Sequence, residues 1–230
     1  MGKTIVVVGF GPGISTAVAE KFGSSGFSVA LIARSEAKLA TGVEALKAKG
    51  IQAAAFAADA GDPAAIRAAI GKARAALGPI TVLHWNAYGG AAAGDFVTAD
   101  VAAIRGVFDV AVVGLLAAIQ ESLPDLKQTK QGAVLVTNGA FGDLTPQADE
   151  YAVNLKAMGL ALANTAKHKL VGLLAPRLKA EGVYVCEVMV AGAIKGTAWD
   201  QGNANLDGST IASKFWELYQ ARTEVRARVS

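Results

Sequence analysis

At 230 residues, 53% of them hydrophobic and 18% charged, the chain is long enough for a substantial core and too apolar to be disordered. The net charge of +3 is small and Lys and Arg form no basic run, which argues against a nucleic-acid partner. The single Cys186 cannot form an internal disulfide, which predicts a reducing, cytoplasmic setting. The charge-free apolar run 110–120 is too short to cross a bilayer, so we expect no membrane association.

Short β-branched runs alternate with longer helical patterns along the chain. The β-branched runs predict strands at 4–8, 28–33, 52–57, 80–85, 133–137 and 183–190, and an edge strand near 225–229. Helical periodicity predicts helices at about 14–24, 35–49, 62–77, 98–127, 148–181 and 210–220. This alternation predicts an α/β fold with one Rossmann-type, doubly wound parallel sheet of about seven strands and helices on both faces. Because no linker or repeat interrupts the pattern, we expect residues 1–230 to form one domain.

The first predicted strand runs directly into a glycine-rich turn and then into a helix. Glycines at such a turn let the backbone approach a pyrophosphate, whose charge is stabilised by the N-terminus of the following helix. The pattern therefore predicts a phosphate-binding turn formed by Gly9, Phe10, Gly11, Pro12, Gly13 and Ile14.

The end of the second predicted strand indicates which dinucleotide binds. A carboxylate about twenty residues after the glycine turn would hydrogen-bond the ribose hydroxyls and repel a 2′-phosphate. This strand ends in Arg34 and Ser35 instead, and a guanidinium binds phosphate bidentately. The sequence thus favours NADP over NAD. The structural alternative is a solvated Arg34 and a Ser35 that only caps the next helix.

These residues together resemble the short-chain dehydrogenase/reductase family over nearly the whole chain. Gly9, Gly13 and Ile14 match the family's Gly-x-x-x-Gly-x-Gly turn, in which Ser15 replaces the last glycine. The resemblance implies further cofactor contacts after the third, fourth and sixth strands. They come from Asp59 and Ala60, from Asn86, Ala87 and Tyr88, and from Gly192, Ile194 and Thr197.

The family's catalytic residues match less well. The resemblance implies a tyrosine proton donor, a lysine that holds the nicotinamide ribose, a serine that orients the substrate and an asparagine that carries a relay water. Ala111 occupies the asparagine position, and Gly139, preceded by Asn138, occupies the serine position.

The Tyr-x-x-x-Lys pair has two possible placements. The run around Lys167 resembles the family's lysine segment but leaves Ala163 at the tyrosine position. The other placement uses Tyr151 and Lys156, whose spacing would turn the side chains about 140° apart on a regular helix. We favour Lys167 as the ribose-binding lysine, Tyr151 as a proton donor that enters from outside the helix register, and Asn138 as the substrate anchor.

The pattern as a whole predicts an NADP-dependent oxidoreductase that transfers hydride between the nicotinamide and a carbonyl or alcohol carbon of a small molecule. The alternatives are a dinucleotide-binding sensor or assembly protein with little turnover, and an enzyme that reduces an activated C=C bond. The all-round apolar segments 107–120 and 155–175 indicate either packing on the sheet or contacts within a homodimer or homotetramer. His84 is expected in the core, and the two histidines show no metal-ligand spacing.

Overall fold

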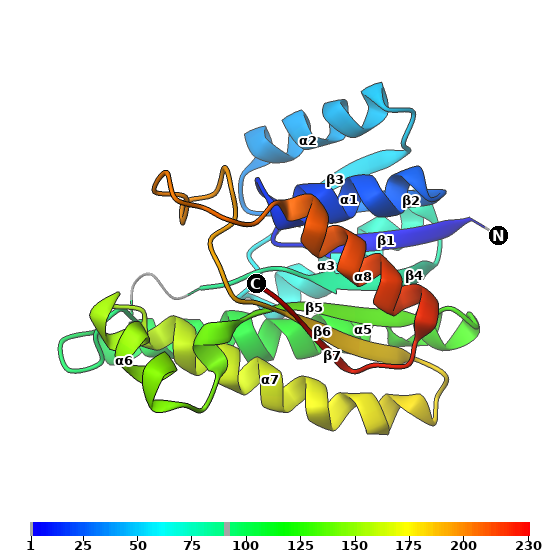
Figure 1. Cartoon of the computed structure of the whole chain (residues 1–230). Coiled ribbons are helices and arrows are strands. Elements are labelled where there is room, and N and C mark those ends of the chain that lie inside the picture. Colours follow the sequence, from blue (N-terminus) through cyan, green and yellow to red (C-terminus); the bar gives the residue numbers. More distant parts are fainter. Residues whose placement is uncertain (1, 90–92) are drawn as a thin grey trace.

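The computed structural model describes residues 2–89 and 93–230, whose backbone forms a seven-stranded parallel sheet with helices on both faces (Figure 1). The strand order is β3-β2-β1-β4-β5-β6-β7, so the chain starts in the middle and winds outward twice. The predicted doubly wound α/β fold is confirmed, with each strand within two residues of its expected position. The strands are β1 (Lys3–Val8), β2 (Phe27–Ala33), β3 (Ala53–Ala57), β4 (Ile80–Trp85), β5 (Ala133–Gly139), β6 (Tyr184–Val190) and β7 (Arg226–Val229).

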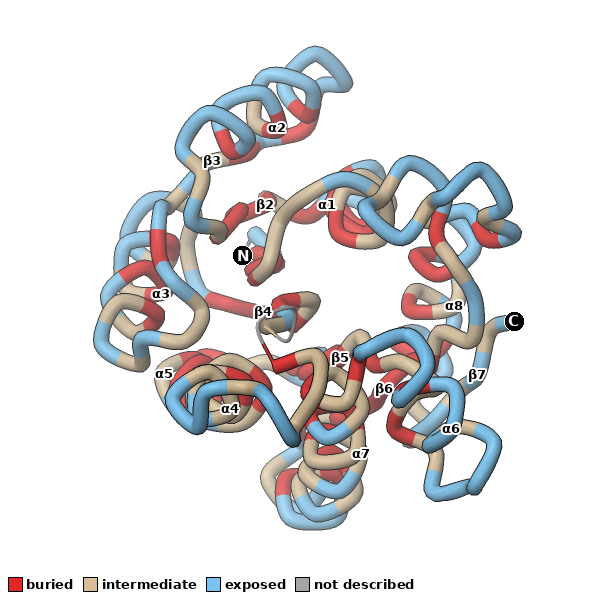
Figure 2. Tube along the Cα trace, turned by 90° about the vertical axis from the view of Figure 1, so that its left-hand side faces the viewer, coloured by how far each residue is buried: buried red, intermediate tan, exposed pale blue. Residues whose placement is uncertain are grey.

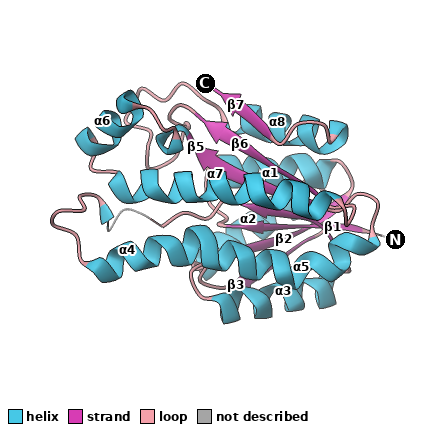
Figure 3. Cartoon of the chain, turned by 90° about the horizontal axis from the view of Figure 1, so that it is seen from below, coloured by secondary structure: helices cyan, strands magenta, loops and turns pink. Residues whose placement is uncertain are grey.

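Two apolar layers enclose the sheet, because alternate residues of the buried strands point to opposite faces. One layer contains α1 (Ile14–Ser24), α2 (Glu36–Ala48) and α8 (Gly208–Ala221). The other contains α3 (Pro63–Leu77), α5 (Leu115–Gln128) and α7 (Met158–Lys179). Figure 2 shows the two layers end-on, and Figure 3 shows α5 and α7 lying along the face seen from below.

Side chains cap the starts of α2 and α3, which follow β2 and β3. Ser35 Oγ accepts a hydrogen bond from Lys38 N at the start of α2. Asp62 Oδ1 accepts from two backbone amides at the start of α3, where Pro63 follows with its φ already suited to a helix. Both caps stand at the carboxyl edge of the sheet, where they fix the loops that surround the candidate site.

The helix predicted at 98–127 is a continuous helical run over Val101–Gln128 that contains a widened turn. It consists of α4 (Val101–Phe108), the π-helical segment η2 (Asp109–Gly114) and α5. Gly114 lets the widened turn approach the loop after β3, because a Cβ there would lie 1.9 Å from Ala60 O. The whole run has the length and apolar composition of a membrane span, a property shared by core helices of soluble proteins. Here α5 is tied to α3 by the 2.6 Å ion pair between Arg74 and Asp125.

The prediction of one helix over 148–181 is wrong. The chain forms α6 (Pro146–Asn154) and α7, with a break between them. Lys156 takes the left-handed conformation at φ 50°. Its amide donates to Val153 O and the amide of Ala157 donates to Ala152 O, in the pattern that ends helices. Gly94 fits into the break, since a Cβ there would lie 2.5 Å from Lys156 O. Helical periodicity cannot show this stop, because the residue that makes it is not a glycine.

Candidate functional site

The carboxyl ends of β1 and β4 touch each other through Gly9. Gly9 has φ +84°, and a Cβ there would lie 2.4 Å from Ala87 N. Asn86, the residue directly after β4, donates a hydrogen bond of 3.3 Å from its Nδ2 to Gly9 O. Only glycine fits this approach, so Gly9, Asn86 and Ala87 are brought together at the middle of the sheet edge.

The glycine turn closes on itself through Ser15. Its Oγ accepts from Gly11 N and donates to Gly11 O, each over 2.9 Å, and Thr16 Oγ1 donates to the same carbonyl. A Cβ at Gly11 would meet no atom within 4 Å, so this part of the turn is open. The open backbone precedes the N-terminus of α1, where an anion is stabilised.

The loop after β6 covers the far end of the turn. Gly13 has φ +88°, and a Cβ there would lie 2.6 Å from Thr197 Cγ2 and 3.1 Å from Ile194 Cγ2. Thr197 Oγ1 donates to Ile194 O over 2.7 Å, and Ile194 is paired with Leu206 across the loop. Residues 193–207 therefore form a cover over the glycine turn, which we call the β6 loop. Gly192 stands exposed at its start.

A pocket of about 430 Å³ lies between the ends of β2 and β3 and the helical segment 103–110. Arg34 is exposed at its rim, and Asp59 Oδ1 accepts a hydrogen bond from Gly61 N inside it. Two further predicted residues, Ala60 and the exposed Tyr88, are next in sequence to residues that line the pocket. Ser35 does not line it, and its Oγ caps α2, which is the helix-capping role that the sequence offered as an alternative. The lining consists of Arg34, Asp59, Gly61, Asp62, Gly89, Ala103, Gly106, Val107, Asp109 and Val110.

Lys167 lies beneath the carboxyl end of β5. The side chain projects from α7, its residue is only 3% exposed, and Nζ donates to Thr137 O over 3.1 Å. Burial lowers the pKa of this lysine to about 8, although the negative charge of Glu187 raises it in part. Lys156, the other candidate lysine, is exposed in the break before α7.

Glu187 is a fully buried carboxylate on β6 that joins four elements. Its Oε2 accepts from Asn138 Nδ2 over 2.8 Å, and its Oε1 accepts from Arg226 Nε over 2.9 Å. His168 Nδ1 lies 2.7 Å from Oε1 without hydrogen-bond geometry. A charge that is wholly withdrawn from water persists only with such partners, so this network joins the end of β5, the middle of β6 and the start of β7 to α7.

Asn138 is held on all sides by this network. Its amide donates to Glu187 and to Asn164 O, and its Oδ1 accepts from Gly139 N. A substrate oxygen would reach the Asn138 amide only if one of these bonds broke. Gly139 is also constrained, because a Cβ there would lie 2.6 Å from Asn164 Nδ2. A serine at that position therefore needs Asn164 to move.

Ala111 and Ala163 occupy the positions at which the family resemblance implies the asparagine and the tyrosine. Both are buried, and both belong to one small apolar cluster with Ala93 and Val107. The two departures are therefore neighbours in space, and each alanine packs where a polar side chain would otherwise stand.

Tyr151 on α6 belongs to a group of aromatic rings that come from the segments after β5 and β6. The ring lies parallel to that of Phe141, with 5.4 Å between centroids and 9° between planes, and 59% of the residue is exposed. Trp199 of the β6 loop lies 6.4 Å from the Phe141 ring. We call Phe141, Tyr151 and Trp199 the aromatic cluster.

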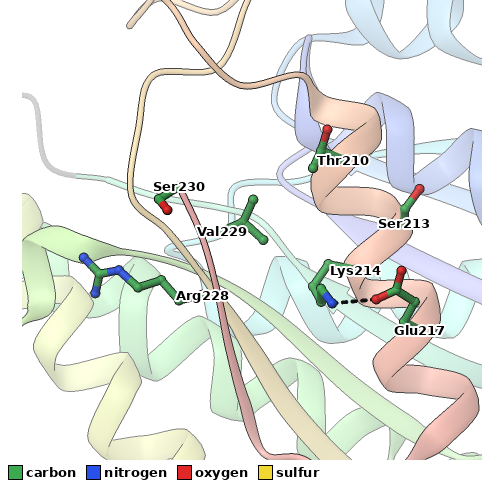
Figure 4. A pocket seen from close by; sticks show the side chains of 7 residues that line it. All are labelled: Thr210, Ser213, Lys214, Glu217, Arg228, Val229 and Ser230. Atoms are coloured by element: carbon green, nitrogen blue, oxygen red, sulfur yellow. Dashed lines mark hydrogen bonds and ion pairs between the residues drawn. The ribbon is translucent and has the colours of Figure 1, made fainter.

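A second pocket, of about 550 Å³, lies between α8 and the C-terminal strand β7 (Figure 4). Its charged residues have partners: Lys214 contacts Glu217 at 2.5 Å, and Arg228 contacts Asp143 at 2.7 Å. None of the predicted site residues lines it. The lining is Thr210, Ser213, Lys214, Glu217, Arg228, Val229 and Ser230.

His84 lies in the core as predicted. Its Nε2 is 3.0 Å from Thr137 Oγ1, and burial lowers the pKa of the ring to about 3, so the ring is neutral. Within residues 2–89 and 93–230, no group of three or more His, Cys, Asp and Glu side chains could hold a metal ion.

Sequence reasoning missed Glu187, Arg226 and the aromatic partners of Tyr151. One signal was present, namely a lone acid in the apolar strand sequence Val-Cys-Glu-Val-Met. A charge at an inward strand position indicates a buried partner. The identity of that partner is not visible in the sequence, because Asn138 and Arg226 lie 49 and 39 residues away from Glu187.

Comparison with known proteins agrees with this geometry. A short chain dehydrogenase of Pseudocercospora fijiensis is 36% identical over 136 residues, which cover 58% of this chain. That match spans 44% of the relative, so the chain corresponds to less than half of that protein's length.

Solved structures share the fold over nearly the entire chain. A metagenomic short-chain oxidoreductase in complex with NADP superposes with a TM-score of 0.80 at 24% identity, covering 99% of this chain and 95% of that one. An NADPH-bound short chain oxidoreductase from Pseudomonas aeruginosa PAO1, which contains an atypical catalytic center, gives 0.86 at 18% identity, with coverage of 99% and 95%. The family model for short chain dehydrogenases matches residues 3–152. With that match over more than half of its length, the chain belongs to the short-chain dehydrogenase/reductase family.

Proposed function

We propose that this protein is an NADP-dependent oxidoreductase that interconverts a carbonyl and an alcohol on a small organic substrate. The observation that carries the proposal is the contact between Gly9 and Ala87 beside the pocket rimmed by Arg34. The glycine turn presents open backbone at the N-terminus of α1, which suits a pyrophosphate, and Arg34 is a cation suited to a ribose phosphate. Family neighbours that bind NADP or NADPH support this choice of cofactor.

In this proposal a dinucleotide lies along the carboxyl edge of the sheet. Arg34 and Ser35 would hold the ribose phosphate, and Asp59 and Ala60 would flank the adenine. The turn from Gly9 to Ile14 would hold the pyrophosphate. The nicotinamide half would lie against Asn86, Ala87, Tyr88, Lys167, Gly192, Ile194 and Thr197. When bound, the nicotinamide supplies or accepts the hydride.

The chain's own side chains supply the remaining chemistry. Lys167 presents a buried ammonium whose pKa of about 8 keeps it largely protonated at neutral pH. We propose that it holds the nicotinamide ribose and that Tyr151 Oη exchanges the proton with the substrate oxygen. Both amide hydrogens of Asn138 are donated within the protein, to Asn164 O and Glu187 Oε2. Asn138 would therefore anchor the substrate in one of two ways. It would either exchange one of these hydrogen bonds for one to the substrate, or act indirectly by fixing the end of β5.

Titration with NADPH and NADH, followed by fluorescence, tests the cofactor. Loss of the phosphate-binding guanidinium in Arg34→Ala should weaken NADPH binding about tenfold to a hundredfold and leave NADH binding almost unchanged, since a charge-assisted bidentate contact is lost. Lys47→Ala, which removes an exposed cation from the far end of α2, is the matched control and should change neither. Equal affinity of the unaltered protein for both nucleotides would overturn the NADP assignment.

Turnover is tested by following NADPH oxidation with a panel of aldehydes and ketones. Tyr151→Phe keeps the ring and removes the hydroxyl, so a fall in kcat of about 10²–10⁴-fold is expected if Oη carries the proton. An unchanged kcat in that variant would exclude Tyr151 as the proton donor. Tight NADPH binding without turnover of any substrate would instead exclude the oxidoreductase assignment.

We also propose that the protein is cytoplasmic and assembles as a homodimer or homotetramer. Val113 in η2 and Leu162 and Leu173 on α7 are exposed apolar side chains on the two segments that the sequence marks as apolar all round. Light scattering coupled to gel filtration should show an oligomer, and Leu173→Glu should shift it toward the monomer. The buried, unpaired Cys186 is in keeping with a reducing compartment.

A further inference from the structure

The aromatic cluster joins the two parts of the candidate site. Phe141 lies in the short η3 turn (Ala140–Gly142) directly after β5, and a Cβ on the next residue, Gly142, would lie 2.9 Å from Asn164 Cβ. Asn164 precedes Lys167 by three residues on α7, so the two side chains lie on the same face of that helix. Trp199 follows Thr197, which covers the glycine turn, by two residues. The rings thus connect the lysine side of the site to its cover.

Two of the three rings are largely open to solvent. Tyr151 is 59% exposed, Trp199 is 42% exposed, and the neighbouring Leu144 is 85% exposed. Large apolar side chains gathered at the carboxyl edge of a parallel sheet, beside a candidate catalytic lysine, are typical of a surface that binds a ligand.

The charges around the cluster are already partnered or directed elsewhere. Asp143 is paired with Arg228 at 2.7 Å. Asp200 accepts from Gly196 N and Gly202 N over 2.8 and 3.0 Å, and these bonds hold the pKa of its carboxyl below the usual value. Asp149 and Glu150 are exposed on α6 about 200° and 100° around the helix from Tyr151, at 100° per residue. The cluster therefore offers ring faces and no charge.

From these contacts we infer that the site takes a carbonyl compound that bears a neutral aromatic ring, which packs against Phe141, Tyr151 and Trp199. This inference rests on the proposed function, because the carbonyl must be the group that reacts. Its carbon gains a hydride and its oxygen a proton to give the alcohol, while the reduced nicotinamide is oxidised. Aromatic rings packed edge-to-face or offset attract one another beyond their apolar contact, and a saturated ring lacks this attraction.

A matched pair of ketones tests the inference. Acetophenone and cyclohexyl methyl ketone carry the same methyl carbonyl and rings of similar size, one aromatic and one saturated. With NADPH, kcat/KM should be about 3- to 10-fold higher for acetophenone, which corresponds to the strength of one or two aromatic contacts. Trp199→Ala should abolish most of this preference, and Trp199→Phe, which restores a ring, should recover it.

Tyr151→Phe separates stacking from proton transfer. This variant keeps the ring, so the preference between the two ketones should persist even when turnover falls. Equal kcat/KM values for both ketones in the unaltered protein, or an equal fall for both in Trp199→Ala, would overturn the inference. A Trp199→Ala variant that changes oligomeric state in gel filtration and not ketone preference would also overturn it, since the cluster would then face a second copy.

Calorimetric titration of each ketone into the NADP-loaded protein keeps the two proposals distinguishable. Tighter binding of acetophenone without turnover would support the ring site and exclude the oxidoreductase assignment. Turnover of both ketones without preference would support the oxidoreductase assignment and exclude the ring site. Binding of neither ketone would overturn the ring site.

Discussion

The carboxyl edge of the sheet is built by backbone shape at β1, β2 and β4 and by buried side-chain pairing at β5, β6 and β7. On the first half, Gly9 and Gly13 take positive φ values and contact neighbouring chain segments directly. On the second half, the buried Glu187 binds the buried amide of Asn138 and the half-exposed guanidinium of Arg226. The first half therefore depends on the absence of side chains, and the second on the pairing of specific ones.

This difference explains where the chain departs from the family pattern. The backbone-built half keeps Gly9 and Gly13 of the family's turn, because the contacts there exclude any larger residue, and only the third glycine is replaced, by Ser15. In the other half, Ala111 and Ala163 pack together where the asparagine and tyrosine would stand, and Gly139 packs against Asn164. Side chains that contact one another can be replaced together, so this half keeps the family's strands and has different residues packed at their ends.

Removing Glu187 should have the largest effect on stability. Glu187→Ala leaves the buried Asn138 amide without its acceptor and an empty space in the core, which together cost about 2–4 kcal/mol of unfolding free energy, whereas the half-exposed Arg226 can be solvated. Urea denaturation measures the loss. Glu181→Ala is the matched control, because that carboxylate also contacts two cations, Lys127 and Arg177, but at the surface.

The control should lose about 1 kcal/mol or less, as exposed ion pairs do. Glu187→Gln keeps the hydrogen bond to Asn138 and removes the charge, so its loss should lie between the two. Equal losses in Glu187→Ala and Glu181→Ala would show that the second half of the edge is not held by buried pairing.

Adding a methyl group at Gly9 should cost about 3 kcal/mol, from a left-handed backbone and an overpacked contact together. Gly26→Ala separates the two causes, since Gly26 has φ +88° and open space around its Cα. That control should lose only about 1–2 kcal/mol and keep its affinity for NADPH. If both variants lost the same amount in thermal unfolding, close contact with Ala87 would not be what selects glycine at position 9.

Lys167 should make the unfolding free energy of the protein depend on pH in the alkaline range. Its folded pKa of about 8 lies below the ordinary 10.5, so the unfolded chain binds more protons between these values. The unfolding free energy of the unaltered protein should therefore rise relative to that of Lys167→Met as pH increases from 8 to 10.5. A shift of this size corresponds to about 3 kcal/mol.

Below pH 8 both states carry the charged lysine, so the difference between the two proteins should be constant there. Paired urea denaturation curves at several pH values give this difference. A difference that stayed flat from pH 8 to 10.5 would show that the ammonium is not withdrawn from water.

The sequence predicted the strands, the turn and the helix start of the first half because the signals for them are local. The strand, the glycines and the helix start all lie within residues 3–24, and Arg34 follows at the next strand end. The second half depends on partners that are 39 and 49 residues apart, which no periodicity shows. The break before α7 was missed for a related reason: Lys156 ends α6 in a conformation usually taken by glycine, and Gly94 from a distant segment fits against it.

Ser35 should show the smallest effect and the sharpest separation of its two possible roles. Its Oγ caps α2, so Ser35→Ala should lose about 1 kcal/mol of unfolding free energy. Ser35→Asp keeps a cap and should be as stable as the unaltered protein, but its negative charge would repel a ribose phosphate held by Arg34. NADPH affinity should then fall in Ser35→Asp while NADH affinity stays the same. If Ser35→Asp bound both nucleotides as well as before, Ser35 would serve the helix alone, and discrimination between the nucleotides would have to come from Arg34.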